Sequence, residues 1–268
     1  MLSDDRGAVL HFSAAPARIV SLVPSLTEAL CALQACDRLV GIDRHSNFPP
    51  EVRELPRLGG LDDAQVERIA LLRPDVVLAA PHARVVARLE ALGIAVLVLH
   101  TRSQPEVQHS LTVLAQMLEK PEAAQRQWQH IQAQLAEAAA RVPATLRGRS
   151  VYFEVDSSPF AAGTASFIGE TLQRLGLRNI AAADLGPFPK LSPEFVVRAN
   201  PQIVFGEARA VQAMATRPGW AGMWALRHDQ VCAFAAADFE PLVRPGPRLG
   251  EAALQMADCL VRLGRNLP

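Results

Sequence analysis

Short apolar runs alternate along the chain with segments whose apolar residues recur at three- and four-residue spacing. The runs are rich in β-branched residues and predict buried strands, whereas the spaced segments predict helices. The predicted strands are 18–23, 39–42, 75–80, 94–99, 151–155 and 231–234. The predicted helices are 83–92, 166–175 and 248–263, and another begins at Ser25, which forms a capping box with Glu28. Strands that alternate with helices predict an α/β fold with largely parallel sheets.

One pattern occurs twice, once in each half of the chain. A glutamate, Glu67 or Glu194, is followed seven positions later by a proline, then by a polar residue and an apolar run. This order predicts a short helix, a proline stop and a buried strand. Asp62 or Asp63 is expected to cap the first helix, and Ser192 the second. The duplication predicts two similar lobes, and clefts between lobes are common binding sites for small ligands.

Residues 103–142 show no strand pattern. Pro121 is expected to begin a long helix that carries Trp128, Ile131, Leu135 and Ala139 on one face. A helix of about 20 residues spans roughly 30 Å, the width of a small lobe, so we predict a rigid connector. The expected parts are an N-terminal extension (1–15), an N-terminal lobe (16–102), connecting helices (103–143) and a C-terminal lobe (144–268). The predicted fold is therefore α/β, with two α/β lobes joined by a long connecting α-helix and a ligand cleft between the lobes.

Composition narrows the function classes. Of the 268 residues, 50% are hydrophobic and 20% charged, which is typical of a globular protein with room for two lobes. Basic and acidic residues balance at 27 each without a lysine or arginine run, so we expect no nucleic-acid partner. The longest aliphatic run, 94–99, is too short to span a bilayer, so the chain is not expected to be membrane-spanning.

The first residues and the cysteines bear on the compartment. Met1–Arg6 is acidic and polar and lacks the features of a secretory signal, so we expect a periplasmic protein if a signal peptide has been removed and a cytoplasmic one otherwise. The four cysteines are Cys31, Cys36, Cys232 and Cys259, and they form no CxxC motif. We predict that they are free, buried and equivalent to small hydrophobic residues, without disulfide or metal roles.

Several motifs resemble one family. The segment IVSLVPSLTE at 19–28 resembles the opening of the cobalamin-binding proteins that serve ABC importers. Segments 41–50, 67–77, 158–163 (SPFAAG) and 192–204 fit the same family in the same order, so the resemblance covers about residues 16–263. The wider group includes iron-siderophore and haem-binding proteins. Its fold of two α/β lobes joined by one long helix agrees with the predicted connector.

The resemblance implies a function and two docking residues. It implies a monomeric solute-binding protein, not an enzyme and without a cofactor, that delivers cobalamin, a related corrinoid or another metal chelate to an ABC permease and its ATPase. Glu67 and Glu194 match glutamates on the outer tips of the lobes, which pair with permease arginines. Such exposed charges set docking register and encounter rate more than affinity. The alternative is that each is a first-turn acid favoured by the helix dipole.

The positions that match ligand contacts of the family are partly changed here. The ligand-binding candidates are His45, Leu61, Glu154, Phe188, Asp238 and Arg244. Leu61 and Phe188 match tryptophan positions, His45 a tyrosine and Glu154 a phenylalanine. The last two candidates fit the polar contacts to corrin side chains. The expected site is therefore more polar and less aromatic, and a haem or another metal chelate would fit it equally well.

Alternatives to a corrinoid carrier stay open. His45, Glu154 and Asp238 supply three ligand types for zinc or manganese, but no HxxxH, HxH or HxxE spacing supports a preformed site, so no metal is expected. A cytoplasmic corrinoid-binding protein would suit the missing signal. A chelatase-like enzyme rests on fold analogy alone, because the common catalytic motifs are absent. Trp220 and Trp224, four apart on an expected helix, are predicted to pack in the core and not on a ligand.

Overall fold

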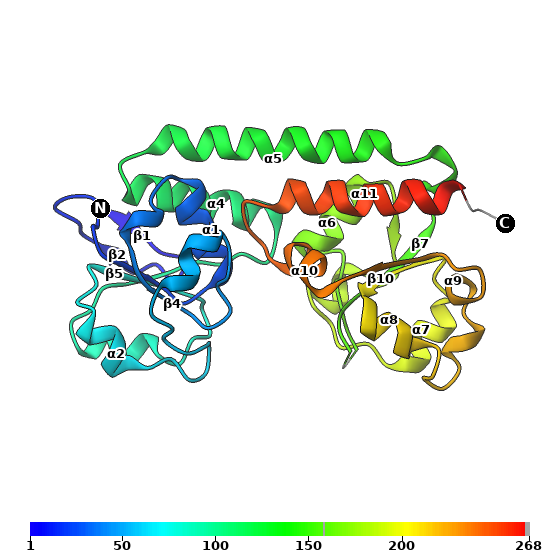
Figure 1. Ribbon diagram of the computed structural model, residues 1–268, viewed down its shortest axis with the longest axis horizontal. Helices are drawn as coiled ribbons and strands as arrows, with labels where there is room; N and C mark the ends of the chain where they lie inside the picture. The colour runs from blue at the N-terminus through cyan, green and yellow to red at the C-terminus, as the bar shows by residue number, and fades with distance from the viewer. Residues whose placement is uncertain (158, 266–268) are drawn as a thin grey trace. The chain divides into compact units, whose positions relative to one another are not determined.

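Two units make up the described part of the chain, residues 1–157 and 159–265 of a computed structural model (Figure 1). Unit 1 contains Met1–Thr101 and Pro105–Gln129, and unit 2 contains Arg102–Gln104 and the chain from His130 onward. Ser158, the first residue of the predicted SPFAAG motif, lies outside the described residues. Among the described residues, no helix is both long enough and apolar enough to cross a membrane.

Unit 1 is built on a parallel four-stranded sheet with the order β4-β3-β5-β6. Its strands are β3 (Ile19–Ser21), β4 (Leu39–Ile42), β5 (Val76–Ala79) and β6 (Val96–Val98). Its helical segments are α1 (Pro24–Ala32), η1 (Cys36–Arg38), η2 (Pro50–Glu54), α2 (Val66–Leu71), α3 (Val86–Ala91) and, except for its first residue, α4 (Gln104–Met117). Side chains from both strands and helices, Val20, Val77 and Leu89 among them, form one apolar core. The four strands predicted here are confirmed.

Unit 2 is built on a mixed sheet with the order β11-β10-β7-β8, in which β9 also pairs with β7. Only β8 is antiparallel to its neighbour. The strands are β7 (Ser150–Asp156), β8 (Phe160–Ala161), β9 (Arg178–Asn179), β10 (Ile203–Glu207) and β11 (Val231–Phe234). The helical segments are η3 (Ala144–Leu146), α6 (Phe167–Arg174), η4 (Ala183–Leu185), α7 (Pro193–Ala199), α8 (Ala208–Met214), η5 (Trp220–Gly222), α9 (Trp224–Arg227), α10 (Ala236–Phe239), η6 (Glu240–Val243) and α11 (Leu249–Arg265).

The predicted long helix is confirmed as α5 (Pro121–Arg141), with 121–129 in unit 1 and 130–141 in unit 2. Ile131 and Leu135 are buried on the predicted face. Within unit 2, α5 lies along α11, and Arg141 pairs with Asp258 at 3.0 Å. Gly250 permits this approach, because a Cβ there would lie 2.4 Å from the side-chain oxygen of Gln134.

The duplicated pattern is also confirmed, as α2 followed by β5 and α7 followed by β10. Ser192 caps α7 as predicted, and its hydroxyl accepts from the amide of Phe195 at 3.2 Å. The residue before each proline, Arg73 or Asn200, is left-handed, with φ of 46° and 45°. Both copies therefore end the helix in the same way, with a left-handed residue just before the proline that cannot continue it.

The polar residue after each proline fastens the pattern to a neighbouring strand. The amide of Asp75 donates to the carbonyl of Arg18 at 2.8 Å, and the Asp75 carboxylate accepts from the amide of the same arginine at 2.8 Å. Gln202 exchanges the same two bonds with Ser150, at 2.9 and 3.1 Å. The polar residue after each proline is thus explained by the pair of hydrogen bonds that it makes to the neighbouring segment.

Two predicted helix caps are wrong. The N-cap of α1 is Val23, two residues before the predicted cap, and Ser25 lies buried in the first turn without capping the helix. Proline suits the first position of this helix because its missing N–H would have no helical partner there. Helix α2 begins at Val66, too far from Asp62 or Asp63 for either to cap it. In both places the sequence pattern matched a helix cap, but the helix begins at a different residue.

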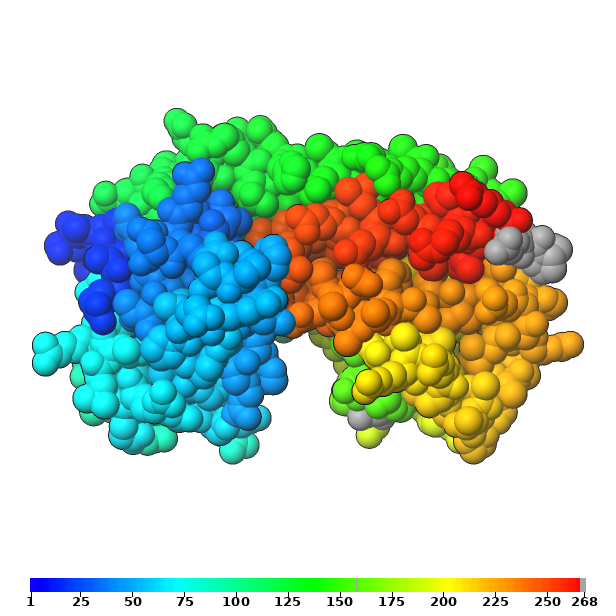
Figure 2. Space-filling view, viewed as in Figure 1, coloured from blue at the N-terminus to red at the C-terminus, as the bar shows by residue number. Residues whose placement is uncertain are grey.

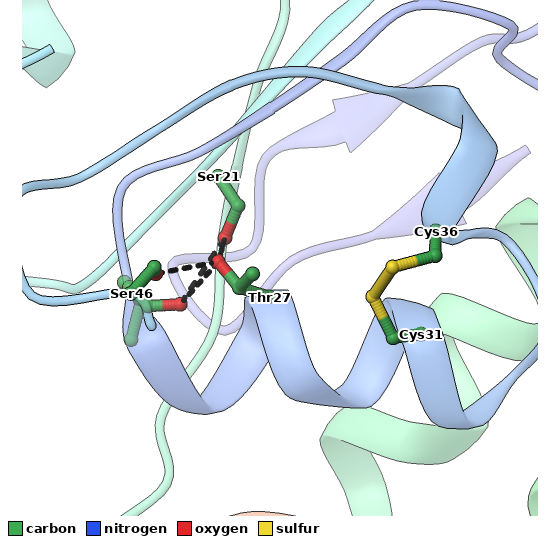
Figure 3. The surroundings of a disulfide bond; sticks show 6 residues. Ser21, Thr27, Cys31, Cys36 and Ser46 are labelled. Atoms are coloured by element: carbon green, nitrogen blue, oxygen red, sulfur yellow. Dashed lines mark hydrogen bonds between the residues drawn. A yellow bond between two sulfur atoms is a disulfide. The ribbon is translucent and has the colours of Figure 1, made fainter. Parts of the chain in front are cut away.

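The prediction of free cysteines is wrong. Cys31 is bonded to Cys36 (Figure 3). Cys232 is bonded to Cys259, so the chain has no free cysteine. The first pair joins the end of α1 to η1, and the second joins β11 to α11. Spacing along the sequence does not reveal such pairs, because the two sulfur atoms meet only when the elements pack.

The two tryptophans do not share a helix, as had been expected. Trp220 lies in η5, is fully buried and contacts the ring of Tyr152 edge-on at 5.8 Å, so its predicted core position is confirmed. Trp224 begins α9 and is only half-buried, against His228 at 4.5 Å. Met223, in extended conformation between the two segments, breaks the expected helix.

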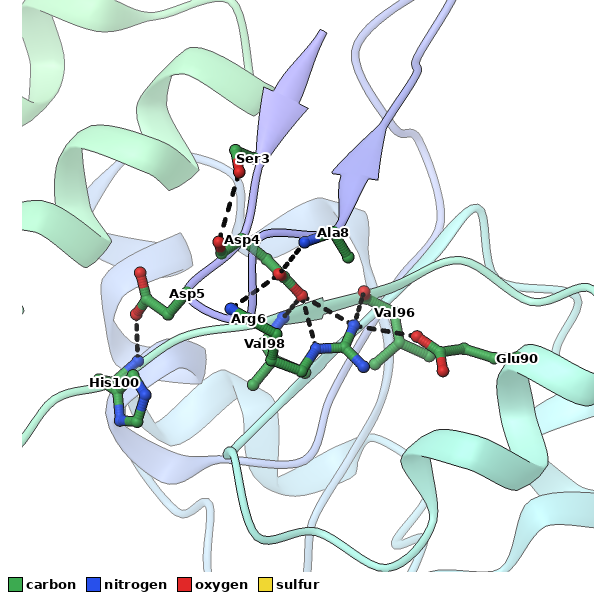
Figure 4. Close-up of polar contacts among 9 residues, drawn as sticks. All are labelled: Ser3, Asp4, Asp5, Arg6, Ala8, Glu90, Val96, Val98 and His100. Carbon is green, nitrogen blue, oxygen red and sulfur yellow. Dashed lines mark hydrogen bonds and ion pairs between the residues drawn. The ribbon is translucent and has the colours of Figure 1, made fainter.

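Residues 1–11 contain a small antiparallel pair, β1 (Leu2–Ser3) and β2 (Val9–Leu10), that the sequence pattern did not predict. The turn between these strands covers the free edge of β6 (Figure 4). The Asp4 carboxylate accepts from the amides of Ala8, Arg6 and Val98 and from the Arg6 guanidinium, which also reaches the Val96 carbonyl. An uncovered edge strand would offer these groups to another chain.

Candidate functional site

The connection between β4 and α2 in unit 1 carries two of the ligand-binding candidates, in the loops before and after η2. His45 follows β4 and is exposed, and Leu61 is exposed in the loop before α2. The two loops are tied together, because the Arg44 amide donates to the Gly59 carbonyl at 2.7 Å and the Arg44 guanidinium pairs with Asp63. In open α/β sheets, ligands bind outside the carboxyl ends of the strands, and His45 lies at that end of β4.

A hollow of about 250 Å³ lies at the carboxyl ends of β7 and β10 in unit 2. It is lined by Glu154, Val155, Asp156, Ser157, Glu207, Ala210 and Phe239. Three of these residues are acids, but they differ in what they offer a ligand. Glu207 caps α8, accepting from the amides of residues 209 and 210 at 3.1 and 3.2 Å.

Glu154 lines this hollow, but its charge is balanced inside unit 2. Its side chain is 1% exposed, and its two oxygens accept from the Arg217 guanidinium at 2.5 and 2.8 Å. The Tyr152 hydroxyl adds a third bond at 2.9 Å. Hydrogen bonding to Glu154 raises the pKa of Arg217 above its ordinary value. Burial, reinforced by the Glu154 charge, raises the pKa of Tyr152. A ligand in the hollow would therefore meet an ion pair and not a bare carboxylate.

Sequence reasoning did not identify Arg217 as a partner of Glu154. The signal available was Glu154 itself, an acid inside a predicted buried strand. Buried carboxylates need a counter-charge or several hydrogen-bond donors. That requirement predicts a basic partner without saying which of the 27 basic residues supplies it.

The remaining candidates lie elsewhere in unit 2. Phe188 is half-buried and packs on Phe167, with ring centroids 6.1 Å apart. Asp238 is exposed on α10, which follows the carboxyl end of β11. Arg244 is largely buried and pairs with Glu240 one helical turn earlier. Of these three candidates, Phe188 offers an aromatic surface and Asp238 an exposed carboxylate, whereas Arg244 is already paired.

The two predicted docking glutamates are exposed at corresponding places in the two units. Glu67 lies in the first turn of α2 and Glu194 in the first turn of α7. Within its own unit, each helix lies away from α5, and the cyan region around α2 is open to solvent (Figure 2). Glu67 is 80% exposed and meets Arg88 at 3.2 Å. Surface pairs of this kind contribute about 0–1 kcal/mol, so Glu67 can exchange this partner.

No preformed metal site is found in 1–157 and 159–265, where no three histidine, cysteine or acidic side chains gather closely enough to hold an ion. Of the three residues considered as metal ligands, His45 belongs to unit 1, and Glu154 and Asp238 belong to unit 2. Glu154 has the partners already described.

Known proteins resemble this chain over most of its length. Residues 19–236 match the profile of a family described as periplasmic binding protein. YvrC, an ABC transporter substrate-binding lipoprotein of Bacillus subtilis (strain 168), is 29% identical over 258 residues, covering 91% of this chain and 80% of YvrC. The periplasmic vitamin B12 binding protein BtuF of Vibrio cholerae superposes with a TM-score of 0.77 at 26% identity, covering 94% of this chain and 98% of BtuF. The periplasmic heme-binding protein RhuT from Roseiflexus sp. RS-1, in apo form, gives 0.77 at 26%, covering 91% and 98%.

Proposed function

Since the chain belongs to the periplasmic binding protein family, we propose that it is the solute-binding component of an ABC importer and carries cobalamin or a related corrinoid. The resemblance to cobalamin-binding proteins noted in the sequence is confirmed by the family match and the likeness to BtuF. That likeness over nearly the whole chain is the observation that carries the proposal. The family is one of binding proteins, so we propose no catalysed reaction.

The residues of each unit support a ligand with hydrogen-bonding groups around an apolar body. Leu61 and Phe188 provide apolar surface, and His45 and Asp238 provide exposed polar groups. Carboxylates accept hydrogen bonds from amides, which a corrinoid carries at its rim. A haem, the second candidate, carries carboxylates instead. The equal likeness to RhuT favours testing it beside the corrinoids.

Glu67 and Glu194 are proposed to contact arginines of the permease. Both are exposed first-turn acids, one in each unit, at corresponding places in a duplicated pattern. The first-turn position alone would explain an acid through the helix dipole. It does not require exposure at both copies, which docking does require.

The two disulfides support a location outside the cytoplasm. Disulfides persist in oxidising compartments such as the periplasm and are rare where glutathione keeps thiols reduced. This chain has all four cysteines paired. We therefore propose a periplasmic or extracellular carrier over the cytoplasmic corrinoid-binding alternative.

Calorimetric titration with cyanocobalamin, cobinamide, haemin and zinc tests the ligand. Saturable one-to-one binding of a corrinoid is the expected result. Binding of haemin alone would replace the corrinoid with the haem alternative. Binding of zinc alone would overturn the chelate proposal and direct attention to His45.

Charge reversal tests docking separately from binding. Glu67→Arg/Glu194→Arg is expected to abolish uptake by cells while leaving calorimetric affinity unchanged. Glu122→Arg is the matched control, because Glu122 is also an exposed acid in the first turn of a helix, α5. Uptake that survives the double reversal would contradict the docking proposal.

A further inference from the structure

A chain of buried side-chain oxygens adjoins the loop that carries His45, and Figure 3 shows its members Ser21, Thr27 and Ser46. The Thr27 hydroxyl is 2.9 Å from that of Ser21 and 2.9 Å from that of Ser46. The Ser46 hydroxyl in turn donates to the carboxylate of Asp43. All four side chains are at most 1% exposed. Thr27 donates to Ser21 and Ser46 donates to Asp43, so three hydroxyls and one carboxylate form a single connected network out of contact with water.

These four residues join three elements of unit 1. Ser21 ends β3, Thr27 lies in α1, and Asp43 immediately follows β4. The Asp43 amide donates to the Ser21 carbonyl at 2.9 Å, so the loop leaves β4 fixed against β3. The other Asp43 oxygen accepts from the amide of His45 at 2.7 Å.

Arg57 holds the same loop from its other side. Its guanidinium donates to the carbonyls of Asp43 and Ser46, which lie on either side of His45 in sequence. The backbone around His45 is therefore bound by a carboxylate, by a guanidinium and, through Ser46, by helix α1. The His45 side chain itself is exposed beyond this framework.

We propose that Thr27 and Ser46 are positioning residues that hold the His45 loop in the shape that binds the ligand. This inference rests on the proposed function, in which His45 contacts the chelate. Stability alone does not explain the arrangement, because buried hydroxyl pairs can be replaced by apolar groups of the same shape at little cost. A preorganised loop, by contrast, avoids the cost of ordering it on binding.

Three variants separate positioning from mere packing. Thr27→Val keeps the shape but removes the hydroxyl, and Thr27→Ser keeps the hydroxyl as the conservative rescue. Ser110→Ala is the control, because Ser110 is equally buried in unit 1 but its hydroxyl donates only within its own helix, to Val107 at 2.9 Å. If Thr27→Val does not fold, Ser46→Ala removes the next hydroxyl in the chain.

Two measurements are made on each variant: hydrogen exchange of the peptide containing residues 43–48, and affinity for cyanocobalamin and haemin. Thr27→Val is expected to speed exchange of that peptide and to weaken binding about fivefold to thirtyfold, the effect of losing one or two hydrogen bonds. Thr27→Ser should restore both, and Ser110→Ala should change neither. Unchanged exchange and affinity in a folded Thr27→Val would overturn the inference.

The exchange measurement keeps the two proposals distinguishable. If the wild-type protein binds neither chelate, the proposed function fails, while exchange still reports whether Thr27 orders the loop. If the wild type binds and Thr27→Val binds equally well, the function stands and the positioning role is refuted.

Discussion

Replacing Arg217 with methionine tests the buried ion pair of unit 2. The change removes both guanidinium bonds to the Glu154 carboxylate, which is 1% exposed, and leaves it only the bond from the Tyr152 hydroxyl. Hydrogen bonds to a charged group are worth about 1.5–3 kcal/mol each, and breaking a buried pair costs about 3–5 kcal/mol. The Arg217 guanidinium also lies 4.5 Å from the ring of Trp220, which adds a cation–π contact. Since the Arg217 side chain is 19% exposed, water screens part of the pair, and we expect a loss of about 3 kcal/mol.

Urea denaturation followed by circular dichroism measures the free energy of unfolding of this variant. The matched control is Glu154→Met/Arg217→Met, which removes both charges and is expected to recover at least half of the loss, because no unpaired charge stays buried. A loss below about 1 kcal/mol in the single variant would show that water already solvates the carboxylate. A double variant as unstable as the single one would show that packing, and not charge, is responsible.

Three further outcomes are expected. Tyr152 is the only tyrosine, and because its pKa is raised in the folded protein, the stability that it contributes is complete below about pH 10 and falls by about 1.4 kcal/mol per pH unit above that pH. Tyrosinate absorbance should therefore appear only together with unfolding, and tyrosinate in the folded protein would contradict this prediction. Removing the disulfide in Cys232→Ala/Cys259→Ala should cost about 3–4 kcal/mol in chemical denaturation, because it closes a loop with a sequence separation of 27; an equal stability of oxidised wild type and variant would refute the pairing. Asp4→Ala should lower the free energy of unfolding by about 2–3 kcal/mol, because several amides, including that of Val98, lose a buried acceptor. An unchanged thermal midpoint in calorimetry would show that the edge of β6 is covered without the Asp4 carboxylate.

The candidate site was only partly predictable from the sequence. The sequence identified the polar residues His45, Glu154 and Asp238 through their match to a family, but not what each of them contacts. Glu154 illustrates the difference, because its partner Arg217 lies 63 positions away and meets it only after β7 and the segment following α8 have packed. A one-dimensional pattern records that an acid occupies a buried strand, but not which base neutralises it.

The buried oxygens beneath His45 were likewise beyond the sequence. Thr27 and Ser46 are ordinary residues for a helix and a loop, and nothing in their spacing links them. They meet because β3 and β4 are parallel neighbours, which brings the loop after β4 onto the first turns of α1. Such a chain of contacts depends on strand order, which local periodicity does not encode.

By itself, the sequence determined the alternation of strands and helices, the long helix α5 and the duplicated pattern of α2–β5 and α7–β10. These features follow from local chemistry: apolar periodicity decides which face is buried, and proline is accepted in the first turn of a helix but ends a helix that reaches it from the N-terminal side. The tertiary structure alone decided the two disulfides, the edge cover made by residues 1–11, and the partners of Glu154. Each of these joins groups far apart in sequence, or reverses the chain within a few residues. Their energies arise only when packing brings the groups within a few ångströms and excludes water from between them.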